Sequence, residues 1–428
     1  MNFILKGNIV HNKNLQELAI FENGYLVCKD GVSAGVYADE KSLPREFKSY
    51  IIMDYGNRLI LPGLIDLHVH APQYAFRGLG MDLELLDWLN TYIFKEESRF
   101  TDLDYADEAY KYFVDDLVRG ATTRAVILGT IHNPATMLLM DMMEKSGLIS
   151  FVGKVNMDRN SPPILMEESA RKSIEDTESW IKDVVGKFER TNPIITPRFV
   201  PTCSDELMEG LGKLQRKYKI PVQSHLSENR EEVAWVKDLC PDATSYGDAY
   251  DRYGLFGGES VPTIMAHCVW SRGEEERLLK ERGVYVAHCP QSNLNLASGI
   301  APIRRFIRNG INVGLGSDVA GGSHTSIFRA MSDAIQSSKM YWRLVEQNDA
   351  PLTIPEVLYL ATMGGGKFFG KVGGFEKGYE LDAVVIDDSS IVTPKELTIE
   401  NRLERIIYLG SNENIYAKYV KGKRILVF

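Results

Sequence analysis

Two histidines spaced two residues apart close one of the apolar runs of the chain, Leu64-Ile65-Asp66-Leu67-His68-Val69-His70. Side chains alternate across a β-strand, so Asp66, His68 and His70 are expected on one face, with the apolar residues between them packed against helices on the other. Two imidazoles on one face at a strand end are placed to bind a single metal ion. The alternative is that both histidines end the strand in contact with water, and the pair alone does not decide between these interpretations.

More histidines end other apolar runs of the chain. His225, His267 and His288 each close such a run, and Asp318 follows the next one. In a parallel barrel these ends lie on one face, the face on which active sites are built. Three neutral imidazoles and one carboxylate match the ligand set of zinc, with iron as second choice, and leave a position open for water. A structural role is expected for the remaining histidines, His11, His132 and His324.

A glutamate follows one of these histidines in the sequence Ser224-His225-Leu226-Ser227-Glu228. Glu228 lies one helical turn beyond His225, so its carboxyl group would overhang the open metal position and carry a proton between a water and a substrate ring nitrogen. The alternative role is that of an ordinary first-turn glutamate that complements a helix dipole. Asp318 has two roles open to it, as a metal ligand and as the acceptor of the proton lost by the metal-bound water.

Composition and charge exclude several classes of protein. The 428 residues include 49 basic and 58 acidic side chains, a formal charge of −9 with no basic tail, which disfavours a nucleic-acid partner. No basic and apolar leader opens the chain, and the longest uncharged run is shorter than the ~20 apolar residues that a bilayer requires. Five cysteines without a C-x-x-C pair are typical of reduced thiols, so a cytoplasmic protein is expected.

An alternation of strands and helices positions the histidines. Ser204 precedes a helical spacing of Leu207, Leu211 and Leu214, and similar helical patterns separate eight short apolar runs. The expected strands are residues 59–66, 122–127, 151–155, 194–200, 221–224, 263–266, 284–287 and 311–316. Eight such units predict an α/β protein with a (β/α)8 TIM-type barrel over residues 59–379. A doubly wound open sheet, the alternative, would usually show fewer strands and a Gly-rich first turn.

The two ends of the chain do not follow this alternation. Residues 1–58 and 380–428 contain short apolar strands followed by turns, such as residues 25–28 before Lys29-Asp30-Gly31 and residues 383–386 before Asp387-Asp388. The simplest interpretation is one small composite β-domain built from both ends.

The run from Pro62 to His70, with isolated His225, His267 and Asp318, resembles the amidohydrolase superfamily. These proteins are metal-dependent hydrolases on a (β/α)8 barrel, commonly with a small β-domain built from both chain ends. The resemblance covers essentially the whole chain. It implies a metal ion, zinc, held by His68, His70, His225 and Asp318.

Six further stretches are similar to the guanine deaminases of this superfamily: residues 70–74, 85–90, 196–199, 224–229, 287–293 and 316–322. This similarity implies hydrolytic deamination of guanine to xanthine and ammonia. It implies that His267 orients the attacking water and that Glu228 carries protons. The residues it places against the purine are Gln73, Arg198, Phe199, His225 and Glu228.

The identity of Arg198 helps to predict both the substrate and the number of bound metal ions. An arginine fork can donate to O6 and N7 of guanine, although an ion pair at the barrel rim is the other interpretation of Arg198. Relatives with two metals bridge them with a carboxylated lysine at the end of the fourth strand, where this chain has Arg198, so one metal per chain is expected.

Two alternative functions stay open. The first is another aminohydrolase of the superfamily that acts on an oxidised guanine, a pterin, a triazine or an adenosine derivative. The second is a non-catalytic relative that serves as an assembly scaffold, which would be expected to lack metal ligands or Glu228. Apart from a small-molecule substrate, the expected partner is a second copy of the chain in a homodimer, with neither nucleic acid nor membrane.

Overall fold

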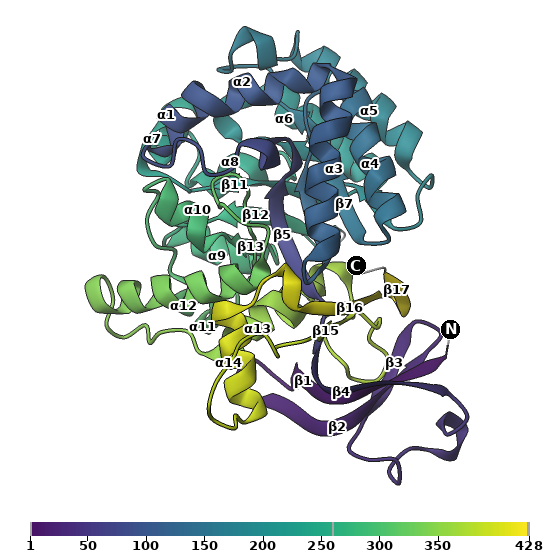
Figure 1. The fold of residues 1–428 in the computed structure, drawn as a ribbon. Coiled ribbons are helices and arrows are strands. Elements are labelled where there is room, and N and C mark those ends of the chain that lie inside the picture. Colours follow the sequence, from purple (N-terminus) through teal and green to yellow (C-terminus); the bar gives the residue numbers. More distant parts are fainter. Residues whose placement is uncertain (1, 259–260, 426–428) are drawn as a thin grey trace.

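Parallel strands and helices alternate through most of the chain in a computed structural model, which describes residues 2–258 and 261–425 (Figure 1). One four-stranded parallel sheet has the order β5 (Leu64–His70), β6 (Thr122–Leu128), β7 (Ile149–Gly153) and β9 (Thr191–Pro193). A second has the order β11 (Val222–Leu226), β12 (Thr263–His267), β13 (Tyr285–His288) and β14 (Asn312–Leu315). A mixed α/β fold with parallel strands is therefore confirmed.

The strand predictions are correct for the second sheet and for β6, and less so elsewhere. The strand predicted at 59–66 covers the end of β4 (Ile51–Pro62) and the beginning of β5. The strands predicted at 151–155 and 194–200 are broken into short pieces, with β8 (Val155–Asn156) paired to β10 (Thr196–Pro197). Pro193 ends β9 and Pro197 ends β10, and a proline has no N–H to donate to a sheet ladder.

The helices form where the sequence supplies caps and apolar faces. Ser204 accepts a hydrogen bond from the backbone N–H of Leu207 at 3.2 Å and caps α6 (Asp205–Tyr218) as predicted, with Leu207, Leu211 and Leu214 buried. The other long helices are α3 (Leu103–Arg119), α4 (Asn133–Ser146), α5 (Ala170–Val184), α7 (Arg230–Leu239) and α12 (Ile327–Leu344). Shorter helices are α1 (Leu85–Trp88), α2 (Phe94–Glu97), α8 (Tyr246–Asp251), α9 (Glu274–Glu281), α10 (Pro290–Asn295), α11 (Ile303–Arg308) and α13 (Ile354–Tyr359).

A third sheet joins the two ends of the chain. Its order is β17 (Lys423–Ile425), β16 (Ile415–Val420), β15 (Ala383–Ile386), β4, β1 (Phe3–Asn12), β2 (Leu18–Lys29) and β3 (Val32–Tyr37). β15 pairs antiparallel with β4, so the segments before and after the parallel sheets meet in one layer, as Figure 1 shows for its purple and yellow strands. The C-terminal segment also contains α14 (Ile399–Leu409), a helix that the strand-like interpretation of this segment did not include.

The strict alternation predicted for β5 is wrong. Ile65 and Leu67 belong to an apolar cluster with Val126 and Ile264 of other strands, whereas Val69 belongs to the larger core that includes the helices. The pairing of β5 with β6 shifts register between Asp66 and Val69, and a bulge of this kind re-aims the side chains that follow it. The apolar residues Ile65 and Leu67 of β5 therefore lie in a different environment from His68 and His70 at the end of the strand.

None of the helices in the described part of the chain combines the length and apolar character needed to cross a bilayer.

Candidate active site

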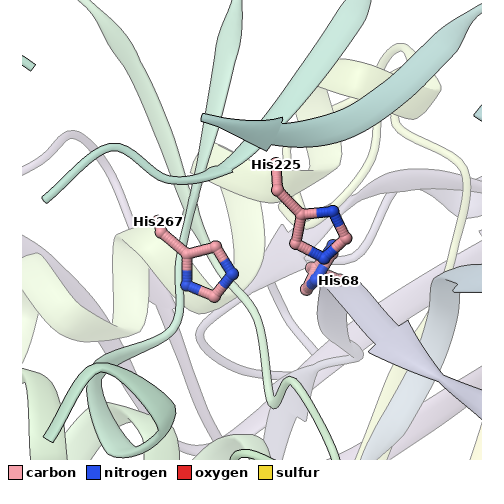
Figure 2. A group of neighbouring side chains, drawn as sticks. All are labelled: His68, His225 and His267. Carbon is pink, nitrogen blue, oxygen red and sulfur yellow. The ribbon is translucent and has the colours of Figure 1, made fainter. Parts of the chain in front are cut away.

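Four potential metal ligands converge at the ends of the strands. His68 and His70 come from β5, His225 comes from β11, and Asp318 follows β14. The Nε2 atom of His70 lies 3.2 Å from Nε2 of His68 and 3.2 Å from Nε2 of His225. The Oδ1 atom of Asp318 lies 3.3 Å from Nε2 of His68 and 3.5 Å from Nε2 of His70. Ring nitrogens of His68, His225 and His267 also lie within 4.8 Å of one another, and Figure 2 shows these three histidines as neighbours.

The spacing of these atoms fits a metal ion. Ligand atoms bound about 2.0–2.1 Å from a tetrahedral ion lie about 3.3 Å from one another, close to the distances found here. The Nδ1 atom of His225 lies 2.6 Å from the carbonyl oxygen of Arg198, so a proton on Nδ1 leaves the Nε2 lone pair directed at the other ligands. Burial lowers the pKa of His70 and His225, which favours neutral imidazoles. The donor set is therefore able to hold a divalent metal.

The backbone around Asp318 is held in place by β5. The N–H of Asp318 donates to the carbonyl oxygen of His68 at 2.8 Å, and Asp318 itself has a left-handed backbone with φ of 46°. Asp66 accepts hydrogen bonds from the backbone N–H of Ser317 at 3.0 Å and of His68 at 3.2 Å. Asp66 therefore positions two ligand-bearing segments. Burial raises the pKa of this carboxyl group to about 6, against the effect of its hydrogen bonds with Ser317.

His267 stands between the two carboxylates of the site. Its Nδ1 atom lies 2.9 Å from Oδ1 of Asn293, which identifies Nδ1 as the donor and turns Nε2 toward the cavity. That Nε2 atom lies 3.4 Å from Oε2 of Glu228 and 3.7 Å from Oδ2 of Asp318. The backbone of His267 is also left-handed, with φ of 72°, and strained residues of this kind cluster at functional sites.

Glu228 is buried beside this group. Its Oε1 atom accepts a hydrogen bond from the Ser298 hydroxyl at 3.1 Å. Burial and the nearby charge of Asp318 raise the pKa of Glu228 to about 8, so the carboxyl group is largely protonated at neutral pH. Its backbone N–H donates to Oε2 of Glu232 at 2.9 Å, and Glu232 belongs to the capping box of α7. The position of Glu228 suits proton transfer, and Glu232, which the sequence reasoning missed, helps to fix it.

One cavity brings together the residues expected to contact the purine. It is lined by Gln73, Arg198, Phe199, His225 and Glu228, together with His70, His267 and Asp318. His68 lies deeper and does not line it. Three apolar residues, Leu85, Trp88 and Leu89, complete one wall. They belong to residues 85–90, one of the stretches similar to guanine deaminases, but the sequence did not indicate a role for these three side chains.

Arg198 lines the cavity and forms a buried ion pair with Glu97. Its Nη1 atom forms a short contact with Oε2 of Glu97, and its Nη2 atom donates to Oε1 of Glu97 at 3.1 Å. Glu97 was not predicted, because one glutamate in the run Lys95-Glu96-Glu97 reads as part of a solvated helix surface.

The remaining histidines lie apart from the ligand group. His288 ends β13 as expected, and burial together with His267 lowers its pKa to about 3. In the described part of the chain, the groups of side chains close enough to share a metal ion do not include His288, His11, His132 or His324.

The chain is similar to known proteins over its whole length. A model of the amidohydrolase family matches residues 59–425. The guanine deaminase of Dictyostelium discoideum is 37% identical over 99% of this chain and 98% of its own length, and that of Mus musculus is 36% identical over 99% and 97%. The structure of guanine deaminase from C. acetobutylicum, with guanine bound in its active site, is 47% identical, covers both chains completely and has a TM-score of 0.96.

Proposed function

The chain belongs to the amidohydrolase family, among its guanine deaminases, and on this premise we propose that it hydrolyses guanine to xanthine and ammonia. The observation that carries the proposal is the single cavity lined by three of the four potential ligands (His70, His225 and Asp318), the buried acid Glu228 and Arg198. Metal-dependent hydrolysis needs a group of side chains that could hold a metal ion and a side chain that carries protons. An arginine side chain can bind one edge of a purine. A scaffold protein would have no need to keep all of them.

We propose zinc as the metal, one ion per chain, held by His68, His70, His225 and Asp318. Three imidazole nitrogens and one carboxylate oxygen suit zinc. The Nε2 atom of His70 lies 3.2 Å from Nε2 of His68, 3.2 Å from Nε2 of His225 and 3.5 Å from Oδ1 of Asp318, which supports a single ion among them. A bound zinc ion lowers the pKa of a water to near 7 and so supplies a nucleophile at neutral pH. Arg198, at the position where two-metal relatives have a carboxylated lysine, cannot form a carbamate.

The purine is proposed to lie between Arg198 and Phe199, with Gln73 at its edge. Guanine presents two acceptors, O6 and N7, on one side, and the outward N–H groups of Arg198 can donate to them. Phe199 is nearly fully buried and offers an apolar wall. His225 would contact the base from the metal side.

Glu228 and Asp318 are proposed to move the protons. Glu228 in its acid form gives a proton to a ring nitrogen as water attacks C2. The ionised Glu228 then takes the proton of the new C2 hydroxyl and gives it to the leaving amino group, and the proton held by Asp318 finally restores the acid form of Glu228. Asp318 accepts the proton of the attacking water, and His267 holds that water in line. Water adds at C2, the C2–N bond breaks, and ammonia and xanthine are the products. The short distances from His267 to both carboxylates support this arrangement.

The rate should fall in mildly alkaline solution. Because Glu228 acts first as an acid and its pKa is raised to about 8, the competent protonated form is lost as the pH rises through that value. We expect kcat/KM for guanine to decrease above about pH 8, tenfold per pH unit once the carboxyl group is ionised. A pH–rate profile measured from pH 6 to 10 tests this. A rate that stays constant to pH 10 would contradict the assigned role.

We further propose that the two four-stranded parallel sheets are halves of one (β/α)8 barrel within residues 59–379, and that the described parts of residues 1–58 and 380–428 form a separate β-domain. The end of β4, residues 59–62, belongs to the sheet of that β-domain. A parallel bridge between Ile195 and Val222 supports closure on one side. On the other side, the hydrogen bonds of Ser317 and Asp318 to β5 support it.

The activity is tested by following the loss of guanine absorbance together with ammonia release. Adenine, cytosine, an oxidised guanine, a pterin, a triazine and adenosine are assayed beside guanine. We expect guanine to give the highest kcat/KM, because the Arg198 fork pairs with its two adjacent acceptors. Faster release of ammonia from any other member of the panel would favour the alternative aminohydrolase function.

A further inference from the structure

Glu97 contacts two of the polar side chains that are proposed to bind the purine, Gln73 and Arg198. Its Oε1 atom accepts a hydrogen bond from Nε2 of Gln73 at 2.7 Å and another from Nη2 of Arg198 at 3.1 Å. Its Oε2 atom takes the short contact with Nη1 of Arg198. Gln73 comes just after β5 and Arg198 lies 101 residues beyond Glu97, so one carboxylate ties together two distant segments.

These contacts are buried, which makes them strong and specific. Glu97 is 5% exposed, Arg198 4% and Gln73 3%. A buried guanidinium is costly without a partner, and a carboxylate that accepts two of its N–H groups fixes the plane of the fork. The ring of Phe94, from the same helix α2, lies 5.2 Å from Cζ of Arg198. Helix α2 therefore holds Arg198 through two different contacts.

Glu97 also determines which groups remain for a ligand. Two of the five N–H groups of Arg198 are used by Glu97, and the other three are left for the cavity or its walls. The amide oxygen of Gln73 accepts the backbone N–H of Ala320 at 3.1 Å, and Nε2 of Gln73 also lies 3.2 Å from Nδ1 of His70. Glu97, Ala320 and His70 together set the orientation of that amide.

We propose that Glu97 is a positioning residue that sets the affinity and selectivity of the site for a base with two adjacent acceptors. It acts through Arg198 and Gln73 and does not touch the reacting atoms. The inference rests on the proposed function, because the ligand in question is guanine. The segment from α1 to α2 then has two functions. Leu85, Trp88 and Leu89 line the cavity with apolar side chains, and Glu97 aligns the polar side chains of Gln73 and Arg198.

The variant Glu97→Gln keeps the shape of the side chain and removes its charge and one acceptor. Because Gln73 and Arg198 bind the base before and during the reaction, their misalignment should weaken ground-state and transition-state binding alike. We expect KM for guanine to rise about 10- to 100-fold while kcat changes less than about threefold and the metal content is unchanged. Steady-state kinetics at saturating and subsaturating guanine measure the changes in kcat and KM separately, and metal analysis measures the metal content.

Control variants separate positioning from a general loss of structure. Glu96→Gln, one residue earlier in α2, removes a partly exposed carboxylate that pairs with Arg99 at 3.0 Å and should leave KM unchanged. Glu97→Asp retains the charge on a shorter side chain and should recover part of the affinity, which also provides a test if Glu97→Gln folds poorly. In an Arg198→Gln background, Glu97→Gln should change KM by less than about threefold, since its main partner is already gone.

The outcomes distinguish this inference from the proposed function. If the wild-type enzyme deaminates guanine and both Glu97 variants retain its KM, Glu97 has no positioning role while the function stands. Fully additive effects of Glu97→Gln and Arg198→Gln would also overturn it. A wild-type enzyme with no activity on guanine would overturn both proposals.

Discussion

Glu228→Gln is expected to lower kcat for guanine by about 10²- to 10⁴-fold, the range that a positioned general acid contributes. Glutamine has nearly the same shape as the protonated glutamic acid, so the hydrogen bond with Ser298 and the packing around the site should persist. What it lacks is a proton that can be transferred to the ring nitrogen and then to the leaving amino group. The comparison is made with steady-state kinetics at saturating guanine.

The control for this variant lies three residues beyond Glu228, in α7. Glu231→Gln changes an exposed side chain one residue beyond the start of α7 and should retain wild-type kinetics. Metal content should be equal in the wild type and in both variants, because Glu228 is not among the proposed ligands. Normal turnover by Glu228→Gln would show that protons take another route.

Asp318→Asn is expected to have an effect of similar size by a different mechanism. The amide is a neutral and weaker ligand, and it cannot accept the proton of the attacking water. Without the aspartate charge, the three imidazoles have no anionic partner, so the fraction of chains that retain zinc after dialysis should fall. Even with zinc in excess, kcat should remain at least about 10²-fold below wild type.

Metal analysis and kinetics together examine this variant. Asp115→Asn, which alters an exposed residue paired with Arg119 at 3.0 Å in α3, serves as the control and should keep both metal and activity. Full activity of Asp318→Asn with one zinc per chain would exclude the dual role of Asp318.

The positions of the proposed ligands could be predicted from the sequence because a strand end is a local feature. Each of His225, His267 and His288 closes a short run of apolar residues, and parallel strands present these ends at one edge. His288 shows the limit of this reasoning, since it satisfies the same pattern yet lies outside the ligand group. The position of a residue at the end of a strand predicts at which edge of the sheet it lies. The direction of its side chain depends on the local backbone.

Features that depend on tertiary contacts were not accessible in this way. The bulge in β5 depends on its pairing with β6, so alternation alone placed Ile65 and Leu67 on the wrong face. The prolines that shorten β9 and β10 could have been used, because they are local. Glu97 could not be found, since its partner is 101 residues away and its own sequence context resembles an exposed helix.

We propose that guanine is deaminated at one metal site built from His68, His70, His225 and Asp318. This proposal is tested by adding zinc stepwise to the metal-free protein while ammonia release from guanine is followed. Activity should be absent at first, increase in proportion to added zinc, and level off at one zinc per chain. Guanine turnover by the metal-free protein, or none at any zinc content, would contradict the claim.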